Sequence, residues 1–489
     1  MSPACATLPP VIEAQGRPRP GCGDPLAFSA ADLAAIAGGI IVRRSDRPIR
    51  GGAVDSRLVE PGNVFFALAG ERTDGHRFLA DAVAHGAAAL VVVREPDPGA
   101  APGDATILRV ADPLAALRAL AAAWRARFDP FTVGITGSVA KTSTKEATAA
   151  VLAARWPTLR SEGNANNEIG LPLTLLRLAP EHRALVLEMG MYVGGEIASL
   201  ARLGRPSVGV VTAVAPVHLV RAGTLRAIED AKAELVEALP DGGTAVLNAD
   251  DPIVCTFDRR TRARVLRYGF APGADVTAEA VEARGAGGMA FDLVARAPRS
   301  ERVRVKIAAL GRHAVANALA AAAVGLVAEL SGAESATGLA APWGTAAARR
   351  GALVEAGGVT ILDDTYNASP PAMRAALELL ATLPGRPVAV LGEMLELGEL
   401  HGASHRAVGE SAAAVVAELV VVGDGAAGIA EGAVAAGLDR ARVHRAATRE
   451  AAIALLPAIL REGDVVLVKA SRGAALEAVV DAIREARAR

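Results

Sequence analysis

Short runs of aliphatic residues recur along this chain, and segments with helical spacing separate them. The runs show little alternation of polar and apolar positions, which is typical of strands covered by helices on both faces of a sheet. Strands that alternate with helices predict right-handed crossovers and mostly parallel sheets. The predicted strands of the middle and last thirds of the chain are 133–136, 184–188, 208–212, 244–248, 359–364, 388–391, 419–422 and 465–469.

The chain is predicted to be an α/β protein with three domains. Its 489 residues exceed the roughly 250–300 residues that one hydrophobic core supports. Two further strands, 64–68 and 88–93, indicate a small α/β unit before the main pattern begins. The predicted parts are a disordered, proline-containing tail over 1–24, a small α/β domain over 25–112, a central domain with a parallel sheet over 113–342 and a C-terminal Rossmann-like domain over 343–489.

One strand leads into a turn with the layout of a phosphate-binding loop. Strand 133–136 is followed by Gly137, and a helix is predicted to begin at Lys141. In such a loop, backbone N–H groups and the helix dipole face an anion. Lys141 would reach the β- and γ-phosphates of a nucleotide, and the Thr142 hydroxyl would ligate Mg²⁺. The predicted nucleotide contacts in this mononucleotide-binding loop are Gly137, Ser138, Val139, Ala140, Lys141, Thr142 and Ser143.

Ala140 departs from the usual pattern of this loop, in which glycine stands directly before the lysine. An ordinary strand–turn–helix connection is therefore the alternative interpretation. If the position requires a positive φ, alanine costs roughly 1–2 kcal/mol, and its methyl group crowds the phosphate. A reduced ATP affinity is then the consequence to test.

Polar residues at the carboxyl ends of the predicted strands are expected to face a ligand, because ligands bind at that edge of a parallel sheet. Glu188 ends one of these strands, and a carboxylate near the phosphate loop suits Mg²⁺, which takes oxygen ligands. A helix cap or a salt bridge is the alternative for Glu188. His218 follows the next strand, where a lone histidine is more often structural. Lys232 lies on a predicted helix, and taken alone it is interpreted as a solvated lysine.

Three more clusters combine amides, carboxylates or cations near predicted strand ends or loops. They suit recognition of polar substrates, phosphates or carboxylates. The clusters are Asn164, Asn166 and Asn167; Asp363-Asp-Thr-Tyr-Asn367; and Lys469, Ser471 and Arg472. His401 and His405 stand four residues apart on a predicted helix. Because no third metal ligand accompanies them, a solvated or substrate-facing pair is favoured over a metal site.

Composition and charge exclude several classes of protein. The net charge of −1 argues against a nucleic-acid-binding surface or a polybasic membrane surface. No apolar run reaches the length of a transmembrane helix. The three cysteines are widely spaced and follow no metal-binding pattern, which predicts a reducing, cytoplasmic location.

Taken in order, a series of segments resembles the motifs of the Mur ligase family over residues 25–485. The combination is specific, although single motifs are not. Within the family, 364–367 and 393–398 resemble the members that add D-alanyl-D-alanine, and not those that add L-Ala, D-Glu or the third residue. The segments are 55–57, 136–142, 163–170, 187–190, 216–218, 311–317, 363–370, 392–398 and 469–472.

The resemblance implies an ATP- and Mg²⁺-dependent ligase that acts, as a monomer, on UDP-MurNAc-tripeptide and D-Ala-D-Ala. The N-terminal domain would bind the UDP part of the first substrate with Ser56 and Arg57. The central domain would bind ATP, and the C-terminal domain would close over both substrates. ATP would phosphorylate the terminal carboxylate of the tripeptide. The amine of D-Ala-D-Ala would then attack the acyl phosphate, a reaction that depends on positioning and electrostatics.

The same resemblance implies roles for single residues. Lys141 would contact the γ-phosphate, and Thr142 and Glu188 would hold Mg²⁺. His218 would lie by a second Mg²⁺, and Lys232 would carry CO₂ as a carbamate that supplies an anionic oxygen ligand. The remaining implied contacts are Asn317, Asp364 and Asn367 for the nucleotide, and Asn164, Asn166, Asn167, Lys469, Ser471 and Arg472 for the substrates.

Four alanines depart from the family pattern, while every charged or metal-binding position matches it. They are Ala140, Ala215, Ala314 and Ala470. These departures are interpreted as drift in an active enzyme. The alternatives are a related amide ligase for another substrate, of the folylpolyglutamate or cyanophycin synthetase kind, and a catalytically weak binding partner of cell-wall enzymes.

Overall fold

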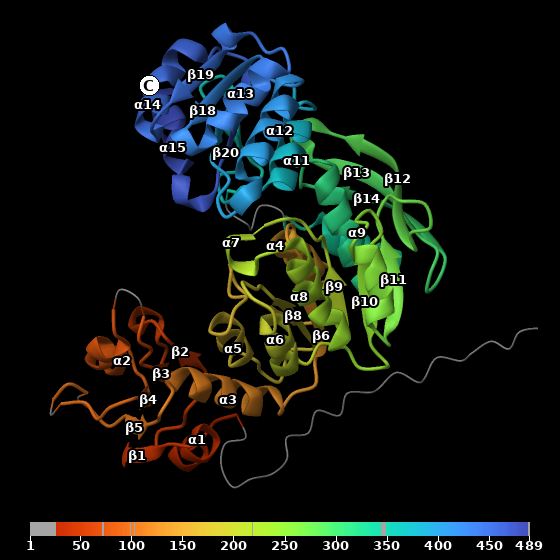
Figure 1. Ribbon diagram of the computed structural model, residues 1–489. Helices are drawn as coiled ribbons and strands as arrows, with labels where there is room; N and C mark the ends of the chain where they lie inside the picture. The colour runs from red at the N-terminus through yellow and green to blue at the C-terminus, as the bar shows by residue number, and fades with distance from the viewer. Residues whose placement is uncertain are drawn as a thin grey trace, which may run out of the picture. The chain divides into compact units, whose positions relative to one another are not determined.

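The computed structural model describes residues 26–70, 73–97, 99–101, 103–217, 219–343 and 349–487. The tail predicted over 1–24 and the candidate ligand His218 lie outside these residues. The chain divides into two compact units (Figure 1). One holds the residues up to Pro130 together with Glu168–Arg183, and the other holds Phe131–Asn167 and the chain from Ala184 onward. The domain boundaries predicted after residues 112 and 342 stay predictions.

The first unit is a small α/β fold, as the sequence predicts for its strands. Its elements are α1 (Ala30–Ala37), β1 (Ile40–Arg43), β2 (Gly52–Ala53), β3 (Val64–Phe66), α2 (Leu79–Ala84), β4 (Ala89–Val92), β5 (Thr106–Arg109), α3 (Pro113–Arg125) and α5 (Gly170–Leu175). The strand order is β1-β5-β4-β3-β2, with only β1 antiparallel to its neighbour. The alanine- and leucine-rich helix α3 packs on α1 and α5, and the Trp124 indole N–H donates to the Leu178 carbonyl at 2.9 Å.

The second unit contains two sheets, and the first of them has nine strands. Its elements are β6 (Phe131–Thr136), α4 (Lys141–Ala153), β7 (Thr158–Arg160), β8 (Ala184–Glu188), α6 (Glu196–Gly204), β9 (Val208–Val211), α7 (Leu219–Ala222), α8 (Leu225–Glu237), β10 (Thr244–Asn248), β11 (Arg264–Tyr268), β12 (Val276–Ala283), β13 (Met289–Ala295), β14 (Glu301–Ile307), α9 (Arg312–Val327) and α10 (Gly332–Ala340). The strand order is β14-β13-β12-β11-β10-β9-β6-β8-β7. The strands from β6 to β12 are parallel, and β12, β13 and β14 form antiparallel pairs.

Helices cover both faces of the parallel part of this sheet (Figure 1). α4 and α9 pack on one face, and α6 and α8 pack on the other. α9 is almost wholly buried and rich in alanine, so its small side chains allow α4 to approach closely. At Gly338 of α10, a Cβ atom would lie 2.5 Å from the Ala150 carbonyl oxygen of α4, which explains a glycine inside a helix there.

The second sheet of this unit has six strands in the order β15-β16-β20-β17-β18-β19. All its neighbouring strands are parallel except β15, which is antiparallel to β16. α11, α12 and α13 cover one face, and α14 and α15 cover the other. Its elements are β15 (Ala352–Ala356), β16 (Val359–Asp363), α11 (Pro370–Leu380), β17 (Arg386–Gly392), α12 (His401–Ala413), β18 (Glu418–Val422), α13 (Ala427–Ala435), β19 (Val443–Ala446), α14 (Arg449–Ile459), β20 (Asp464–Lys469) and α15 (Glu477–Arg487).

The predicted α/β class is therefore confirmed, and every strand predicted from a continuous aliphatic run is present. Several strands were not predicted, among them the hairpin strands β12, β13 and β14. β14 alternates exposed charged residues with apolar ones, so half of its surface faces solvent and it lacks the continuous aliphatic run of a covered strand.

Candidate active site

The phosphate loop, residues 137–142, connects β6 to α4 and is held by the segment that follows β9. The Ser138 N–H donates to the Ala213 carbonyl at 2.7 Å, and the Ala215 N–H donates to Ser138 Oγ at 2.9 Å. Thr212 Oγ1 donates to the Val139 carbonyl at 2.6 Å. Gly137 has φ +151°, and a Cβ atom there would lie 1.9 Å from Thr212 Oγ1. Only glycine fits at position 137, so the strand–turn–helix passage is constrained in the manner of an anion-binding loop.

Ala140 occupies the left-handed region, with φ 67° and ψ −2°, at the N-cap of α4. Position 140 therefore requires a positive φ, and alanine stands where glycine is favoured. The other departures from the family pattern, Ala215, Ala314 and Ala470, do not have positive φ. Backbone strain is therefore confined to position 140 among these four alanines.

Lys141 begins α4, and its ammonium group folds back over the loop. Nζ donates to the Gly137 carbonyl at 2.7 Å. Desolvation lowers the pKa of Lys141, the negative charge of Glu188 raises it and the positive charge of Arg350 lowers it. Lys141 thus lies at the loop that it is predicted to serve and within electrostatic reach of the predicted metal ligand.

Glu188 ends β8 next to β6, and the residue is 2% exposed. Oε1 accepts a hydrogen bond from Asn166 Nδ2 at 2.8 Å. Oε2 is buried and has no hydrogen-bond partner among the described residues. A buried carboxylate oxygen that lacks a donor fits a hard cation, which would be held through oxygen atoms. The salt-bridge alternative is realised only loosely, because Lys145 Nζ lies 3.8 Å from Oε2.

Lys145 is a residue of this site that the sequence analysis missed. Its side chain is wholly buried. Nζ lies 3.0 Å from Glu146 Oε1 and donates to the Gly163 carbonyl at 3.1 Å. Glu146 in turn accepts from Arg160 Nε at 2.7 Å. The adjacent pair Lys145-Glu146 on the helix after the phosphate loop could have indicated this network. Two neighbouring charges on a helix that packs in a core require partners.

The amide loop, residues 163–167, contributes one of the three predicted asparagines to this network. Asn166 holds Glu188, and the Asn166 carbonyl accepts from the Gly190 N–H at 2.8 Å. Asn164 and Asn167 are exposed, as a loop that reads a substrate requires. Asn317 is buried on α9, and its Oδ1 accepts from Thr144 Oγ1 at 3.3 Å, so it ties α9 to α4.

Lys232 lies on α8 with 3% of its surface exposed. Its interpretation as a solvated lysine is therefore wrong. Desolvation, followed by the positive charge of Lys141, lowers the pKa of Lys232 well below its usual value. No hydrogen bond or ion pair of the Lys232 side chain is found within the described part of the chain.

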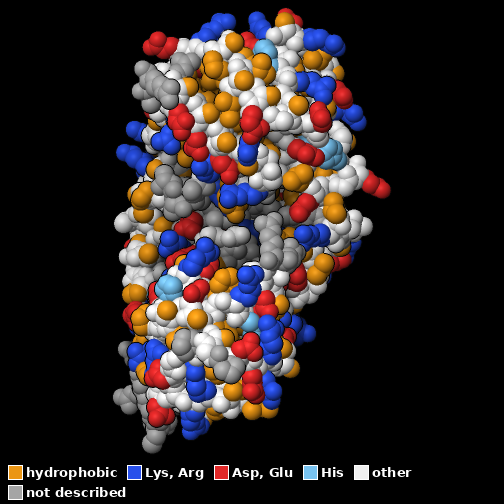
Figure 2. Space-filling view, turned by 90° about the vertical axis from the view of Figure 1, so that its left-hand side faces the viewer, with side chains coloured by type: hydrophobic (Ala, Val, Ile, Leu, Met, Phe, Trp, Pro, Cys, Tyr) orange, Lys and Arg blue, Asp and Glu red, His pale blue; other side chains and the backbone are white. Residues whose placement is uncertain are grey.

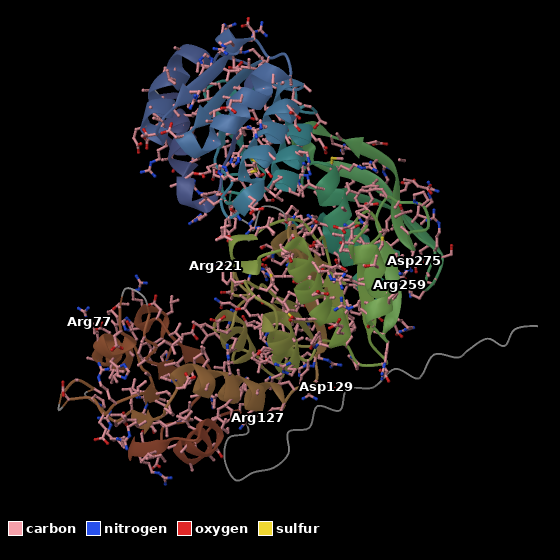
Figure 3. The ribbon with its side chains drawn as sticks, viewed as in Figure 1. Arg77, Arg127, Asp129, Arg221, Arg259 and Asp275 are labelled. Atoms are coloured by element: carbon pink, nitrogen blue, oxygen red, sulfur yellow. The ribbon has the colours of Figure 1, made fainter. Side chains whose placement is uncertain are left out.

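The segment after β8 is joined to α7 by Arg221, which lies 4.4 Å from the centre of the Tyr192 ring and is labelled in Figure 3.

The third polar cluster lies at the carboxyl end of β20. Lys469 is buried, and its Nζ contacts Asp364 Oδ2 at 2.6 Å and the Asn367 carbonyl at 2.8 Å. Ser471 is also buried, and its Oγ accepts from the Leu395 N–H at 2.9 Å. These contacts join two predicted substrate- and nucleotide-binding segments, 364–367 and 469–472, at one end of the sheet. The ligand roles of Lys469, Ser471, Asp364 and Asn367 stay predictions.

The interpretation of the histidine pair as solvated or substrate-facing is wrong for His405, which is wholly buried. The Met394 N–H donates to His405 Nε2 at 2.9 Å, and His405 Nδ1 donates to the His401 carbonyl at 2.7 Å. Desolvation lowers the pKa of His405, consistent with a neutral ring. His401 Nε2 lies 2.9 Å from Glu393 Oε1. The two histidines therefore hold the start of segment 393–398 through the Met394 backbone and the Glu393 side chain.

In the first unit, Ser56 and Arg57 lie in a short 3₁₀ turn between β2 and β3. Ser56 is buried, whereas the Arg57 guanidinium is exposed and lies 2.6 Å from Asp55 Oδ2. The Asp55 side chain also accepts from the Arg57 N–H, which fixes the turn. Their contact with a nucleotide stays a prediction.

Three features of the described residues bear on the class of protein. On the face drawn in Figure 2, basic and acidic side chains are interspersed, with no single basic surface. In the described residues, from which His218 is missing, no three His, Cys, Asp or Glu side chains are grouped to hold a metal. Among those residues, no helix has both the length and the apolar character needed to cross a membrane.

Three family profiles match the chain in order. They are the Mur ligase family catalytic domain at 48–125, the Mur ligase middle domain at 135–325 and the Mur ligase glutamate ligase domain at 349–472. The matched middle domain contains the phosphate loop, Glu188 and Lys232, which are the residues that the geometry brings together.

A curated relative and two solved structures are similar over most of the chain. The UDP-N-acetylmuramoyl-tripeptide--D-alanyl-D-alanine ligase of Mycobacterium tuberculosis is 39% identical, covering 94% of this chain and 98% of that protein. MurF from Acinetobacter baumannii has a TM-score of 0.84 at 29% identity, covering 94% of this chain and 99% of that one. MurF ligase from Thermotoga maritima in complex with ADP has a TM-score of 0.75 at 29% identity, covering 89% and 97%.

Proposed function

Because the chain belongs to the Mur ligase family, we propose that it is the ATP-dependent ligase that joins D-alanyl-D-alanine to UDP-N-acetylmuramoyl-tripeptide in peptidoglycan precursor synthesis. The observation that carries this proposal is the 39% identity to a ligase of that name across 94% of the chain. The geometry agrees, since Glu188 ends the strand next to the one that leads into the phosphate loop, and buried Lys232 lies near enough to Lys141 for the charge of Lys141 to lower the pKa of Lys232.

In the proposed reaction, an oxygen of the tripeptide's terminal carboxylate attacks the γ-phosphorus of ATP, and ADP leaves. The amine of D-Ala-D-Ala then attacks the acyl carbon, and the tetrahedral intermediate collapses with loss of phosphate and a proton. The backbone N–H groups of the phosphate loop and Lys141 would bind the phosphates. Such sites act mainly by positioning the reactants and by stabilising the charge of the transferring group.

Mg²⁺, when bound, would neutralise phosphate charge. Glu188 Oε2 and the Thr142 hydroxyl would hold it, and Glu188 fits this role because Oε2 is buried without a hydrogen-bond donor among the described residues. Lys232 would add an anionic ligand as a carbamate. Its burial supports this, because only the neutral amine captures CO₂ and desolvation favours the neutral form. His218 would complete the set by the family resemblance.

The proposed location is the cytoplasm, and the proposed state is a monomer. The three cysteines are widely spaced and follow no metal-binding pattern, which supports a reducing compartment. ATP and a nucleotide-linked precursor are also substrates of that compartment.

Phosphate release tests the proposed function directly. With UDP-MurNAc-tripeptide, ATP and D-Ala-D-Ala together, we expect phosphate release and a product larger than the tripeptide precursor by the dipeptide less one water, detected by mass spectrometry. Omission of either co-substrate should stop release, and L-Ala-L-Ala should not replace the D-dipeptide. Release that needs a folate or another amino acid acceptor instead would establish a related amide ligase. No turnover with any acceptor would support a binding protein.

Replacement of Ala140 by glycine is expected to stabilise the protein and lower the KM for ATP. The left-handed conformation costs alanine roughly 1–2 kcal/mol, and the greater freedom of glycine in the unfolded chain takes back about 0.4–1 kcal/mol. A net gain of roughly 0–1.6 kcal/mol in the free energy of unfolding is expected. Urea unfolding and initial rates against ATP concentration measure both effects.

The matched control for this variant is Ala154→Gly at the other end of α4. Ala154 has φ −62° and ψ −22°, so glycine relieves no strain there and should only destabilise. If Ala140→Gly destabilises as Ala154→Gly does, the left-handed alanine at 140 carries no strain worth relieving.

A further inference from the structure

The chain uses lysine very sparingly. Of its 52 Lys and Arg residues only five are lysine, at positions 141, 145, 232, 306 and 469. As solvated surface charges the two residues serve equally well. They differ where space is closed, because lysine presents a compact ammonium on a thin stem and arginine presents a broad planar fork. A lysine in so arginine-rich a chain therefore indicates a position where the shape of the cation matters.

Four of the five lysines lie at or near the proposed reaction site or in a buried ion pair. Lys141 serves the phosphate loop, Lys232 is buried near it, and Lys469 is buried against Asp364. Lys306 on β14 is exposed and is the exception. Lys145 belongs with the buried lysines, although neither the motifs nor the proposed reaction assigns it a role.

Lys145 joins three separate segments of the second unit. It stands on α4, one turn after Lys141, and donates to the Gly163 carbonyl of the amide loop at 3.1 Å. It also lies 3.8 Å from Glu188 Oε2 at the end of β8. Because this distance exceeds that of a hydrogen bond, Lys145 balances the carboxylate charge without occupying Oε2.

The partner charges make this arrangement specific to lysine. Glu146 accepts a hydrogen bond from Arg160 and contacts Lys145 at 3.0 Å. The positive charges of Lys145 and Arg160 are therefore balanced by the two carboxylates of Glu146 and Glu188. An arginine at 145 would bring its planar fork into space with no outlet to solvent. Its N–H groups would hydrogen-bond Oε2 directly and compete with a cation for that oxygen.

We infer that Lys145 is a positioning residue of the ligation reaction, which keeps Glu188 Oε2 available for the metal and fixes the amide loop relative to the phosphate loop. This inference rests on the metal role proposed for Glu188. Loss of a group that orients a metal ligand typically costs about 10–100-fold in metal affinity or activity. Lys145 is expected to show an effect of that size.

The decisive comparison is Lys145→Arg with Lys306→Arg, since both keep the charge. Mn²⁺ affinity of the ADP complex is measured by electron paramagnetic resonance, and hydrogen exchange is followed over residues 163–167. In Lys145→Arg we expect Mn²⁺ to bind about 10–100-fold more weakly, with faster exchange of the amide loop and a lower kcat at a little-changed KM for ATP. Lys306→Arg should match the parent in every measurement.

If Lys145→Arg does not fold, the double variant Lys145→Met/Glu146→Gln is tested in its place. This variant removes one positive and one negative charge, so the buried charges stay balanced. Glu146→Gln alone is its control: it should lower the stability, because Lys145 and Arg160 lose their shared carboxylate, and it should keep the Mn²⁺ affinity of the parent. Parent-like Mn²⁺ affinity and exchange in the folded Lys145 variant would overturn the inference. Glu188→Gln separates the two proposals: if it binds Mn²⁺ like the parent, the metal role of Glu188 is wrong, and exchange of the amide loop alone then decides on Lys145.

Discussion

Lys141→Ala should abolish ligation in a protein that remains folded. The substitution removes the cation that lies over the phosphate loop, where Nζ contacts the Gly137 carbonyl at 2.7 Å. Preorganised cations and donors around a transferring phosphoryl group are worth about 10²–10⁵-fold in rate. We therefore expect kcat/KM to fall by at least about 100-fold, measured as phosphate release with all three substrates.

The fold should survive this change because Lys141 is only partly buried, donates to a carbonyl of its own loop and forms no ion pair with any described residue. Circular dichroism and the Tm of the variant check this, with Lys306→Ala as the matched loss of a lysine at an exposed position. Near-normal turnover by folded Lys141→Ala would show that the loop binds no transferring phosphate, and the phosphate-loop assignment would be wrong.

Lys232→Ala is expected to lose most activity, by about 100-fold, and to regain part of it in acetate or formate. The reason is the environment of Lys232, which is 3% exposed and experiences the positive charge of Lys141. Both effects lower the pKa of Lys232 and raise the fraction of neutral amine that captures CO₂. A small carboxylate could then take the place of the missing carbamate oxygen atoms.

Lys232→Arg is the control for this rescue. Arginine keeps the positive charge and fills the space, so neither a carbamate nor an added carboxylate can form the anionic ligand. Removal of CO₂ from the buffer should lower the activity of the parent and leave both variants unchanged. Full activity of Lys232→Ala in CO₂-depleted buffer would show that Lys232 is a buried structural lysine.

The parallel cores and the phosphate loop could be predicted from the amino-acid sequence alone. Short continuous aliphatic runs such as 184–188 are typical of strands covered on both faces. The length of each run and its lack of polar alternation were therefore enough to predict these strands. Gly137 and Lys141 were readable because a loop that wraps an anion imposes local requirements, namely a glycine without Cβ and a cation at the helix start. The ordered motifs indicated the family for the same reason, because each motif is a local feature of the sequence.

The strands β12 and β14 were not predicted because each is half-exposed and carries a weak signal. β14 presents Arg302 and Arg304 to solvent beside Asp292 of β13. Nothing in such a segment distinguishes a strand from a polar connection until its partner strand is known.

The pairing of charged residues became known only from the three-dimensional fold. The strand order β9-β6-β8 puts Glu188 beside the phosphate loop, and the packing of α4 on β8 turns Lys145 toward Glu188 and the Gly163 carbonyl. His405 and Lys232 likewise proved buried although each is an ordinary polar residue in the sequence. Burial and pairing are properties of contacts between segments far apart in the chain. A pattern along one segment carries no information about which distant segment covers it, and the environment of each titratable group therefore emerged only from the fold.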